Sequence, residues 1–441
     1  MKNKYILLTL PLMVSLSFAN SLSITEAYNL ALKNSKEIKS LEYQLESSKE
    51  SVQQAYSRLY PQLSFSYSYM NSKTLVNSKY AGKEGYTIDQ DIKNSTFNLS
   101  QVIFDYEVFS KINMEKARLE AIESKSLLRK QEIAKDVFVA YIDVLQSANT
   151  IELYKSYLNY TKNKLNAESK KLDMNLTNKI DFLKVKVDYN DARINLKKEE
   201  ELLNVKKLKL SQLIGSNDFD LHVNLASINL SSDDIEKLKG AVQYDDSIQN
   251  NLKIKQASSS VKMYKYEIEN SFSYHLPKVT FDASYSDYDI DNPTSDNYND
   301  NKKLYMVSVK IPLFNGGYAM SKVRASKLLH KAALEDLEKQ KQDVEVSFNN
   351  SYSTFIAHLE SLEVYQETLQ SAMLYEQSVS QGLKHGLKSI IDLDESQYKT
   401  AEVKYKFLEN ILELSKSYID LLTLKNNFSQ ISLVEKVLVS Q

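Results

Sequence analysis

Glycine and proline are absent from long stretches of this 441-residue chain, which contains only eight glycines and five prolines. Neither residue occurs from Asp105 to Ile214, from Tyr318 to Gln381, or from Leu387 to the C-terminus. Because both residues interrupt helices, such stretches allow uninterrupted helix. At about 1.5 Å per residue, the second stretch alone could form a helix of roughly 95 Å. The sequence therefore predicts helices far longer than those of an ordinary globular domain.

Apolar residues inside these stretches recur at alternating spacings of three and four. The clearest series is Phe348, Tyr352, Phe355, Leu359, Leu362, Tyr365, Leu369 and Ala372. A narrow apolar seam on a polar helix is typical of coiled-coil packing between neighbouring helices. A soluble coiled-coil scaffold has the same pattern, so the helices alone leave the class of protein open.

The chain also contains an internal duplication. The segment YPQLSFSYSY at 60–69 matches LPKVTFDASY at 276–285, and TFNLSQVIFD at 96–105 matches MVSVKIPLFN at 306–315. Further along, Asp181 corresponds to Asp392. Alternation of apolar and polar residues in the matched segments indicates strands. Each half is therefore predicted to contain a helix, two strands joined by a polar loop, and a long helical hairpin.

The two predicted hairpins turn at equivalent positions. The second turns at Gly382-Leu-Lys-His-Gly386, and the first has Asn175 where the second has Gly386. Asparagine is the residue that best tolerates left-handed backbone geometry after glycine. A single helix through the first stretch would reach about 165 Å, so a turn near Asn175 is the simpler interpretation.

Each predicted strand has roughly ten residues, which is enough to cross a bilayer as a tilted strand. The loops between them, 71–95 and 291–303, are polar, and tyrosines lie near the strand ends. Four strands cannot close a barrel on their own, and open sheet edges are not tolerated in lipid. If the strands enter a membrane, the barrel must be shared between chains.

Composition excludes several classes of function. The N-terminus has a basic start, a short apolar run and small residues before Ala19, which predicts a secretory signal peptide at 1–19. The chain has no cysteine, which excludes disulfides and thiolate metal sites, and its net charge of −1 gives no indication of a nucleic-acid partner. The five histidines are scattered. Since no nucleophile, base and orienting acid cluster together, we expect neither a cofactor nor an enzyme.

These residues resemble those of the TolC-like outer-membrane efflux proteins over essentially the whole mature chain. The resemblance is carried by the duplicated Pro-x-[Leu/Val]-x-Phe strand starts, by PLFNGG at 312–317, and by GLKSIIDLDES at 386–396. It implies a homotrimer in which a transmembrane β-barrel is shared by three chains, each giving four strands. It also implies a long coiled-coil α-helical tunnel in the periplasm and a mixed equatorial belt.

The expected organisation follows from the duplication and the resemblance together. The predicted parts are a signal peptide (1–19); a first repeat (20–215) with strands at about 61–70 and 96–105 and a helical hairpin at 106–215; an equatorial segment (216–245); a second repeat (246–424) with strands at about 277–288 and 304–314 and a hairpin at 318–424; and a C-terminal equatorial tail (425–441).

The resemblance also implies a gate at the periplasmic tip, formed by rings of carboxylates around the trimer axis. Asp392 matches the first ring, and Glu395 matches the second by spacing. Asp394 is an additional acid that leaves the register of the second ring open by one residue. Three carboxylates close to one axis would repel one another and attract cations. An acidic first turn of a helix, favoured by the helix dipole, explains the same residues without a gate.

Family members also carry a basic residue that ties the inner hairpin to an acid of the neighbouring hairpin. Lys388 occupies that place and Asp181 is its candidate partner, whereas the assisting tyrosine of the family is replaced by Leu383. Because lysine lacks the bidentate fork of arginine, we expect a less tightly held closed state. The tip turns at Asn175, Gly382 and Gly386 are where we expect an adaptor to dock.

The function that the resemblance implies is a passive exit duct of a tripartite efflux or type I secretion system. Its expected partners are two further copies, a periplasmic adaptor (membrane fusion protein), an inner-membrane transporter and outer-membrane lipid. Multidrug export, metal ions, siderophores and polypeptides all fit such a duct. The alternative interpretation is an exported coiled-coil scaffold or a periplasmic adaptor protein, against which the duplicated strand pairs argue.

Overall fold

The computed structural model describes residues 22–76, 86–217, 219, 232–242, 249–291 and 298–427. The predicted signal peptide at 1–19 lies outside these residues. Most of the predicted equatorial segment at 216–245 also lies outside them, as does the predicted tail at 425–441 beyond its first three residues.

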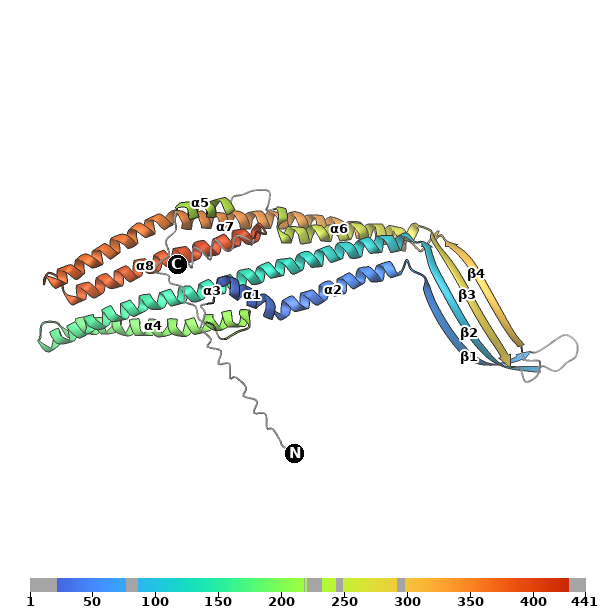
Figure 1. Ribbon diagram of the computed structural model, residues 1–441, viewed down its shortest axis with the longest axis horizontal. Coiled ribbons are helices and arrows are strands. Elements are labelled where there is room, and N and C mark those ends of the chain that lie inside the picture. The colour runs from blue at the N-terminus through green and yellow to red at the C-terminus, as the bar shows by residue number, and fades with distance from the viewer. Residues whose placement is uncertain are drawn as a thin grey trace, which may run out of the picture. The chain divides into compact units, whose positions relative to one another are not determined.

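The order of elements repeats along the chain (Figure 1). The first half contains α1 (Ile24–Asn34), α2 (Lys36–Ser57), β1 (Gln62–Val76), β2 (Tyr86–Phe104), α3 (Tyr106–Asp173) and α4 (Lys179–Ile214). The second half contains α5 (Ser232–Val242), α6 (Leu252–Phe272), η3 (Ser273–His275), β3 (Lys278–Asp291), β4 (Tyr298–Lys310), α7 (Tyr318–Lys384) and α8 (Ile390–Leu424). The expected fold class, mainly helical with an internal duplication, is confirmed.

The two longest helices correspond to the two runs that follow the strand pairs. α3 has 68 residues and α7 has 67. The predicted turn near Asn175 is present, since α3 ends at Asp173 and α4 begins at Lys179. Both hairpins are therefore built from one long helix and a shorter one of 36 or 35 residues.

The four strands form one antiparallel sheet in the order β1-β2-β3-β4. They are longer than the roughly ten residues expected, with 15, 19, 14 and 13 residues, and they extend into the segments predicted as loops. The fourth strand ends at Lys310, not at Phe314 as predicted. Pro312 explains that end, because proline has no N–H to donate to a strand ladder.

The chain divides into two compact units, and each unit takes segments from both repeats. One comprises residues 1–38, 129–251 and 344–441, and holds the tips of both helical hairpins. Its largest fully buried side chains include Phe138, Tyr141, Phe348, Phe355, Ile411, Leu412 and Tyr418. The other comprises residues 39–128 and 252–343, and holds the sheet. A small core lies within it where Ala55 of α2 meets Val108 and Ile112 of α3.

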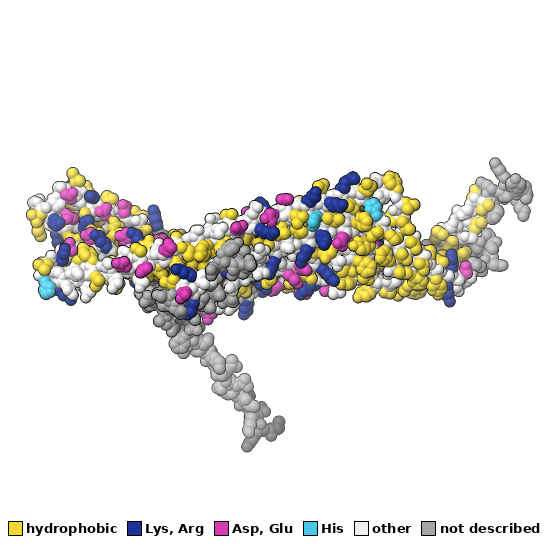
Figure 2. All heavy atoms as spheres, turned by 90° about the horizontal axis from the view of Figure 1, so that it is seen from above, with side chains coloured by type: hydrophobic (Ala, Val, Ile, Leu, Met, Phe, Trp, Pro, Cys, Tyr) yellow, Lys and Arg dark blue, Asp and Glu magenta, His cyan; other side chains and the backbone are white. Residues whose placement is uncertain are grey.

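Over the face shown in Figure 2, basic and acidic side chains are interspersed along the helical part of the chain. This agrees with 56 basic and 57 acidic residues in the sequence. Among the described residues, no helix combines the length and the apolar character that a membrane-spanning helix requires.

Candidate gate and channel wall

The two faces of the sheet differ sharply in polarity. Strand register places Leu63, Leu99, Ala283 and Tyr305 in one row across the four strands. The adjacent row on the same face includes Phe65 and Phe97, whose ring centroids are 4.7 Å apart. Leu63, Phe65, Val307 and Val309 are more than half exposed within the single chain. One face of the sheet is thus apolar and open.

The other face carries mainly hydroxyl and amide groups. One row contains Ser64, Asn98, Ser284 and Leu304, and the next contains Gln62, Ser100, Asp282 and Met306, so the apolar side chains in these rows come from β4 alone. The Ser100 hydroxyl donates to Asp282 over 2.7 Å, and Thr96 and Ser286 are hydrogen-bonded over 3.1 Å. An apolar face opposite a polar face is the arrangement found in strands of a membrane barrel.

The edges of the sheet are not covered within the described part of the chain. β1 pairs only with β2, and β4 pairs only with β3. Just beyond the end of β4, Leu313 is 93% exposed and Phe314 is 87% exposed. Exposed edges with apolar neighbours would be unstable in lipid unless another strand paired with them.

The two junctions between strand and helix lie at equivalent positions of the two repeats, but they are stabilised in different ways. At the first, Asp105 accepts the backbone N–H of Glu107 over 2.9 Å, and Lys278 contacts Asp105 at 3.2 Å and Glu107 at 2.5 Å. Burial of Glu107 opposes its ionisation, but the hydrogen bond and charge of Lys278, together with the nearby charges of Arg58 and Lys322, hold the pKa of Glu107 below its usual value. An ion cluster therefore fixes this junction.

At the second passage, two glycines replace the ion cluster. Asn315 stands 210 residues after Asp105 and accepts the backbone N–H of Ala319 over 3.3 Å. Gly316 and Gly317 follow with φ of 66° and 81°. Since only glycine adopts such angles without strain, this junction turns by backbone geometry.

The hairpin tips are two copies of one turn. Asn175 and Gly386 both have left-handed backbone angles. The N–H of Leu176 donates to the carbonyl of Lys171 over 2.8 Å, and the N–H of Leu387 donates to Gly382 over the same distance. This pattern is a Schellman motif, which satisfies carbonyls at a helix end.

The second helix of each hairpin begins with a matched cap. Asn178 caps α4 by accepting the backbone N–H of Asp181 over 2.9 Å, and its amide donates to that carboxylate. Ser389 caps α8, and the Asp392 carboxylate accepts the backbone N–H of Ser389 over 2.8 Å. That backbone hydrogen bond, together with the Ser389 hydroxyl, holds the pKa of Asp392 below its usual value. Asp181 and Asp392 therefore have a structural role in starting these helices.

The three acids predicted for the gate have different surroundings. Asp392 belongs to the cap and remains partly exposed. Glu395 is also partly exposed and is 3.4 Å from Lys399 of its own helix. Asp394 is 5% exposed and accepts amide hydrogen bonds from Asn159 over 3.2 Å and from Asn163 over 2.9 Å. Asp394 thus faces α3, which argues against its place in an acidic ring.

The residues predicted for the lock are not joined within one chain. In the described part of the chain, no ion pair links Lys388 to Asp181, whose carboxylate accepts from Asn178 instead. Lys388 lies against Gly382, where an added Cβ would stand 2.9 Å from the lysine Cγ. Gly382 belongs to the last turn of α7. A glycine at this position therefore leaves room for the side chain of Lys388.

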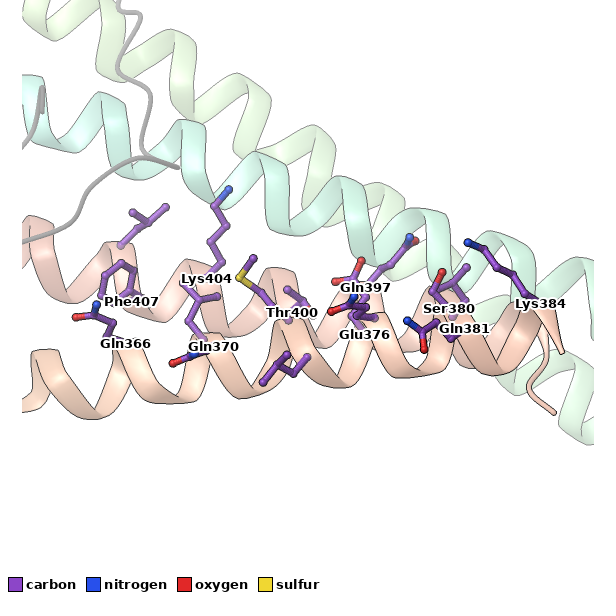
Figure 3. A pocket seen from close by; sticks show the side chains of 16 residues that line it. Gln366, Gln370, Glu376, Ser380, Gln381, Lys384, Gln397, Thr400, Lys404 and Phe407 are labelled. Carbon is purple, nitrogen blue, oxygen red and sulfur yellow. The ribbon is translucent and has the colours of Figure 1, made fainter. Parts of the chain in front are cut away.

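A groove of about 990 Å³ runs between α7 and α8 near the tip (Figure 3). Gln366, Gln370 and Gln381 of α7 and Gln397 of α8 line it, with Lys384 and Lys404 at its sides. Leu369, Leu393 and Phe407 add apolar surface. The groove combines amide groups and apolar patches along the two antiparallel helices of this hairpin. A lining of this kind suits another helix better than a small ligand.

Several residues that make contacts near the hairpin tips could not be identified from the sequence. Asn159 and Asn163 lie one turn apart on α3, yet asparagines at this spacing are common on polar helices. Tyr157 and Tyr398 have ring centroids 4.8 Å apart. These contacts join segments more than 200 residues apart, so local spacing does not indicate them.

Two repeats of helix, strand pair and long hairpin, with a two-faced sheet, define the class of outer-membrane channel proteins. A family model described as outer membrane efflux protein matches residues 27–216 and 243–426. The chain therefore belongs to this family, and it is a channel protein of the outer membrane that serves efflux or secretion.

Relatives and solved structures agree with this membership. Outer membrane protein TolC of Vibrio cholerae is 22% identical over 423 residues, covering 92% of this chain and 94% of that protein. The proteases secretion protein PrtF of Dickeya chrysanthemi is 20% identical over 430 residues, covering 94% and 92%. The Campylobacter jejuni CmeC outer membrane channel superposes with a TM-score of 0.77 at 14% identity, covering 94% and 89%. The expected family and the expected location in the outer membrane are confirmed.

Proposed function

We propose that three copies of this chain form one passive exit duct. In the trimer, β1 of each copy pairs with β4 of the next, and the apolar face of the sheet meets outer-membrane lipid. The observation that carries the proposal is the sheet itself, which has two unlike faces and two unpaired edges within the described residues. Closing the sheet through neighbouring copies removes the edges that lipid would not tolerate.

The helical hairpins would then form the periplasmic tunnel, closed at the tips. We assign the acidic rings to Asp392 and Glu395, because Asp394 is engaged by α3. We assign Lys388 to pair with Asp181 of a neighbouring copy, because in the described part of the chain no ion pair joins the two residues. Three copies of each exposed carboxylate near one axis would attract divalent cations.

The duct needs partners to supply energy and to bridge the periplasm. We propose a periplasmic adaptor at the tip turns around Asn175 and Gly386, and an inner-membrane efflux or secretion transporter beyond it. The groove between α7 and α8 supports a helical adaptor, because its amide and apolar lining extends along both helices. Crosslinking from single cysteines placed at the tips, followed by co-purification, would identify this partner.

Reconstitution in a planar lipid bilayer tests the duct directly. We expect discrete channels from heat-modifiable trimers extracted from the outer membrane. The substitution pair Asp392→Asn and Glu395→Gln should weaken the block of these channels by divalent cations. A protein that fractionates as a soluble periplasmic monomer and forms no channels would instead support the scaffold interpretation.

Substitution of the lock residues gives a separate test. Lys388→Ala and Asp181→Ala should each increase the single-channel conductance, because each removes one partner of the proposed pair between copies. Unchanged conductance in both variants would contradict the lock while leaving the duct in place.

A further inference from the structure

The two faces of the sheet exchange their character along the strands. Phe65 and Phe97 lie on the apolar face, but the same face becomes charged further from the helices. There Lys93 of β2 lies 3.6 Å from Asp289 and 3.2 Å from Asp291 of β3. Because charged side chains are destabilising against lipid, the proposed contact with the membrane ends before this level.

The opposite face changes in the reverse sense at the level of Lys93. Strand register places Met70 of β1, Ile92 of β2 and Ile290 of β3 in one row, and we call these three residues the collar. Met70 is 52% exposed within the chain, and Ile92 and Ile290 are half-buried. The collar is thus an apolar row on a mainly polar face. It lies between a row with Ser68, Asn94, Tyr288 and Asp300 and a pair formed by Ser72 and Gln90.

No helix accounts for the collar as part of a core. Among the described elements, the four strands pack extensively against one another, and none of them packs extensively against a helix. At about 3.4 Å per residue, Met70 lies roughly 17 Å along β1 from Phe65, on the other face. The three apolar side chains therefore need an explanation other than packing within one chain.

The proposed trimer places the collars of all three copies inside the barrel. Its polar face lines the lumen, so the collars lie at one level around the axis. Barrels of about eight strands are filled by their own side chains, whereas barrels of about sixteen enclose an open aqueous channel. A barrel built from three four-stranded sheets lies between these sizes. Long apolar side chains from every copy therefore narrow the lumen, and water solvates such a constriction poorly.

We infer that Met70, Ile92 and Ile290 determine specificity at the outer mouth of the duct, the end of the barrel away from the helices. The inference rests on the proposed trimeric duct, and it adds a constriction distinct from the proposed acidic rings. The collar favours amphiphilic organic solutes over hydrated inorganic ions. The reason is that apolar surface brought against the collar leaves water, whereas a hydrated ion gains nothing there.

Block of single channels in a planar bilayer tests the collar. Tetrapentylammonium and tetramethylammonium carry the same charge but differ in apolar surface, so the first should block more tightly from the outer side. The combined substitutions Met70→Ser, Ile92→Ser and Ile290→Ser should weaken the tetrapentylammonium block by about tenfold, which corresponds to lost contact with about two methylene groups. Block by tetramethylammonium and by divalent cations should stay unchanged.

Two further variants control for general effects on the lumen and on folding. Leu304→Ser with Met306→Ser removes apolar side chains from the same face of β4, in the polar rows nearer the helices, and should leave the block unchanged. Met70→Leu with Ile92→Val and Ile290→Val keeps an apolar collar and should keep the block. Heat-modifiable trimers must be retained in every variant that is compared.

Single cysteines test which face carries the collar, and they do so even if the serine variant fails to assemble. Because the chain has no cysteine, Met70→Cys and Asn71→Cys each provide a unique thiol, on opposite faces of β1. Asn71 lies on the charged face, where its amide donates to Asp91 over 2.8 Å. A positively charged, membrane-impermeant methanethiosulfonate should abolish the tetrapentylammonium block in Met70→Cys and leave it unchanged in Asn71→Cys.

The outcomes separate this inference from the proposed function. Wild-type trimers that form no channels would contradict the duct itself. Channels that tetrapentylammonium blocks no better than tetramethylammonium would overturn the collar and leave the duct intact. A block that survives the serine substitutions, that falls equally in the Leu304 and Met306 control, or that responds to modification at Asn71→Cys would do the same.

Discussion

Asn175 and Gly386 hold the same left-handed backbone conformation at equivalent places in the two hairpin turns, with φ of 57° and 72°. They are 211 residues apart, the same separation as between the capping residues Asn178 and Ser389. The duplication has therefore preserved the geometry of the turn while changing the residue that adopts it.

Substitution at this position should report on backbone strain alone. Among the described residues, no atom lies within 4 Å of a Cβ built on Gly386, so Gly386→Ala adds no clash there. We expect it to cost about 1–2 kcal/mol of stability, because a residue with a Cβ is disfavoured in left-handed geometry. Thermal unfolding followed by circular dichroism measures the cost.

Gly240 provides a matched control for that measurement. It lies in α5, also has open space around its Cβ, and has no left-handed angle. Gly240→Ala should stabilise the protein by about 0.5–1 kcal/mol through helix propensity. Equal effects at both glycines would contradict the strain that we assign to Gly386.

The ion cluster at the first strand-to-helix junction should contribute measurably to stability. Lys278 lies directly opposite Lys310 in the sheet, an unfavourable pairing that Asp105 and Glu107 offset. Lys278→Met should lower the free energy of unfolding by about 1–2 kcal/mol, since it removes the cation that contacts both partly buried acids and leaves Glu107 only Arg58 at 3.9 Å. Chemical denaturation of detergent-solubilised trimers measures this change.

Lys310→Met is the control, because it removes the facing lysine but no ion pair of the cluster. It should be neutral or slightly stabilising. A loss from Lys310→Met as large as that from Lys278→Met would show that sheet packing, and not the ion cluster, accounts for the effect.

The architecture was largely predictable because glycine and proline, the residues that interrupt helices, are rare in this chain. With eight glycines and five prolines, the positions of Gly316, Gly386 and Pro61 mark the ends of elements almost directly. The left-handed residue at Asn175 followed from its match to Gly386. Helix length and turn position are local properties of the sequence. The duplication also allowed the elements predicted in one half to be compared with those in the other.

The predicted strands were shorter than the observed ones for a physical reason. The distal part of the sheet is held by polar pairs, with Tyr69 and Asn71 both donating to Asp91 and Lys73 bound to Asp89. Such strands lack the alternation of apolar residues by which strands are recognised in a sequence. The contact of Asp394 with α3 was equally hidden, because it depends on how two distant helices are aligned.

The cap at Asp392 predicts a specific dependence on pH. The pKa of Asp392 is lowered by hydrogen bonds from Ser389, so the ionised form stabilises the fold. This stabilisation is complete above the unfolded value, for which 3.8 is the ordinary figure, and is lost as the pH falls through the lower folded value. The difference in Tm between wild type and Asp392→Asn should therefore be constant near neutral pH and shrink in strong acid.

Ser389→Ala tests whether the cap is the cause. Since both substitutions remove the same reciprocal hydrogen bonds, their effects on Tm should be far less than additive in the double variant. Full additivity, or a Tm difference that persists in strong acid, would contradict a charged cap at this helix start.

The unlike faces of the sheet give the most direct test of membrane insertion. Phe65 and Ser66 are adjacent on β1 and point to opposite faces, with Phe65 paired to Phe97 and Ser66 to Thr96. Phe65→Arg would place a charge against lipid, at a cost of about 2–4 kcal/mol near the bilayer midplane. Ser66→Arg would place the same side chain on the polar face, where water fills the proposed barrel, and should be tolerated.

The yield of heat-modifiable trimers in the outer membrane should fall for Phe65→Arg and stay near wild type for Ser66→Arg. The opposite order would mean that the apolar face lines the interior, and equal yields would mean that neither face contacts lipid.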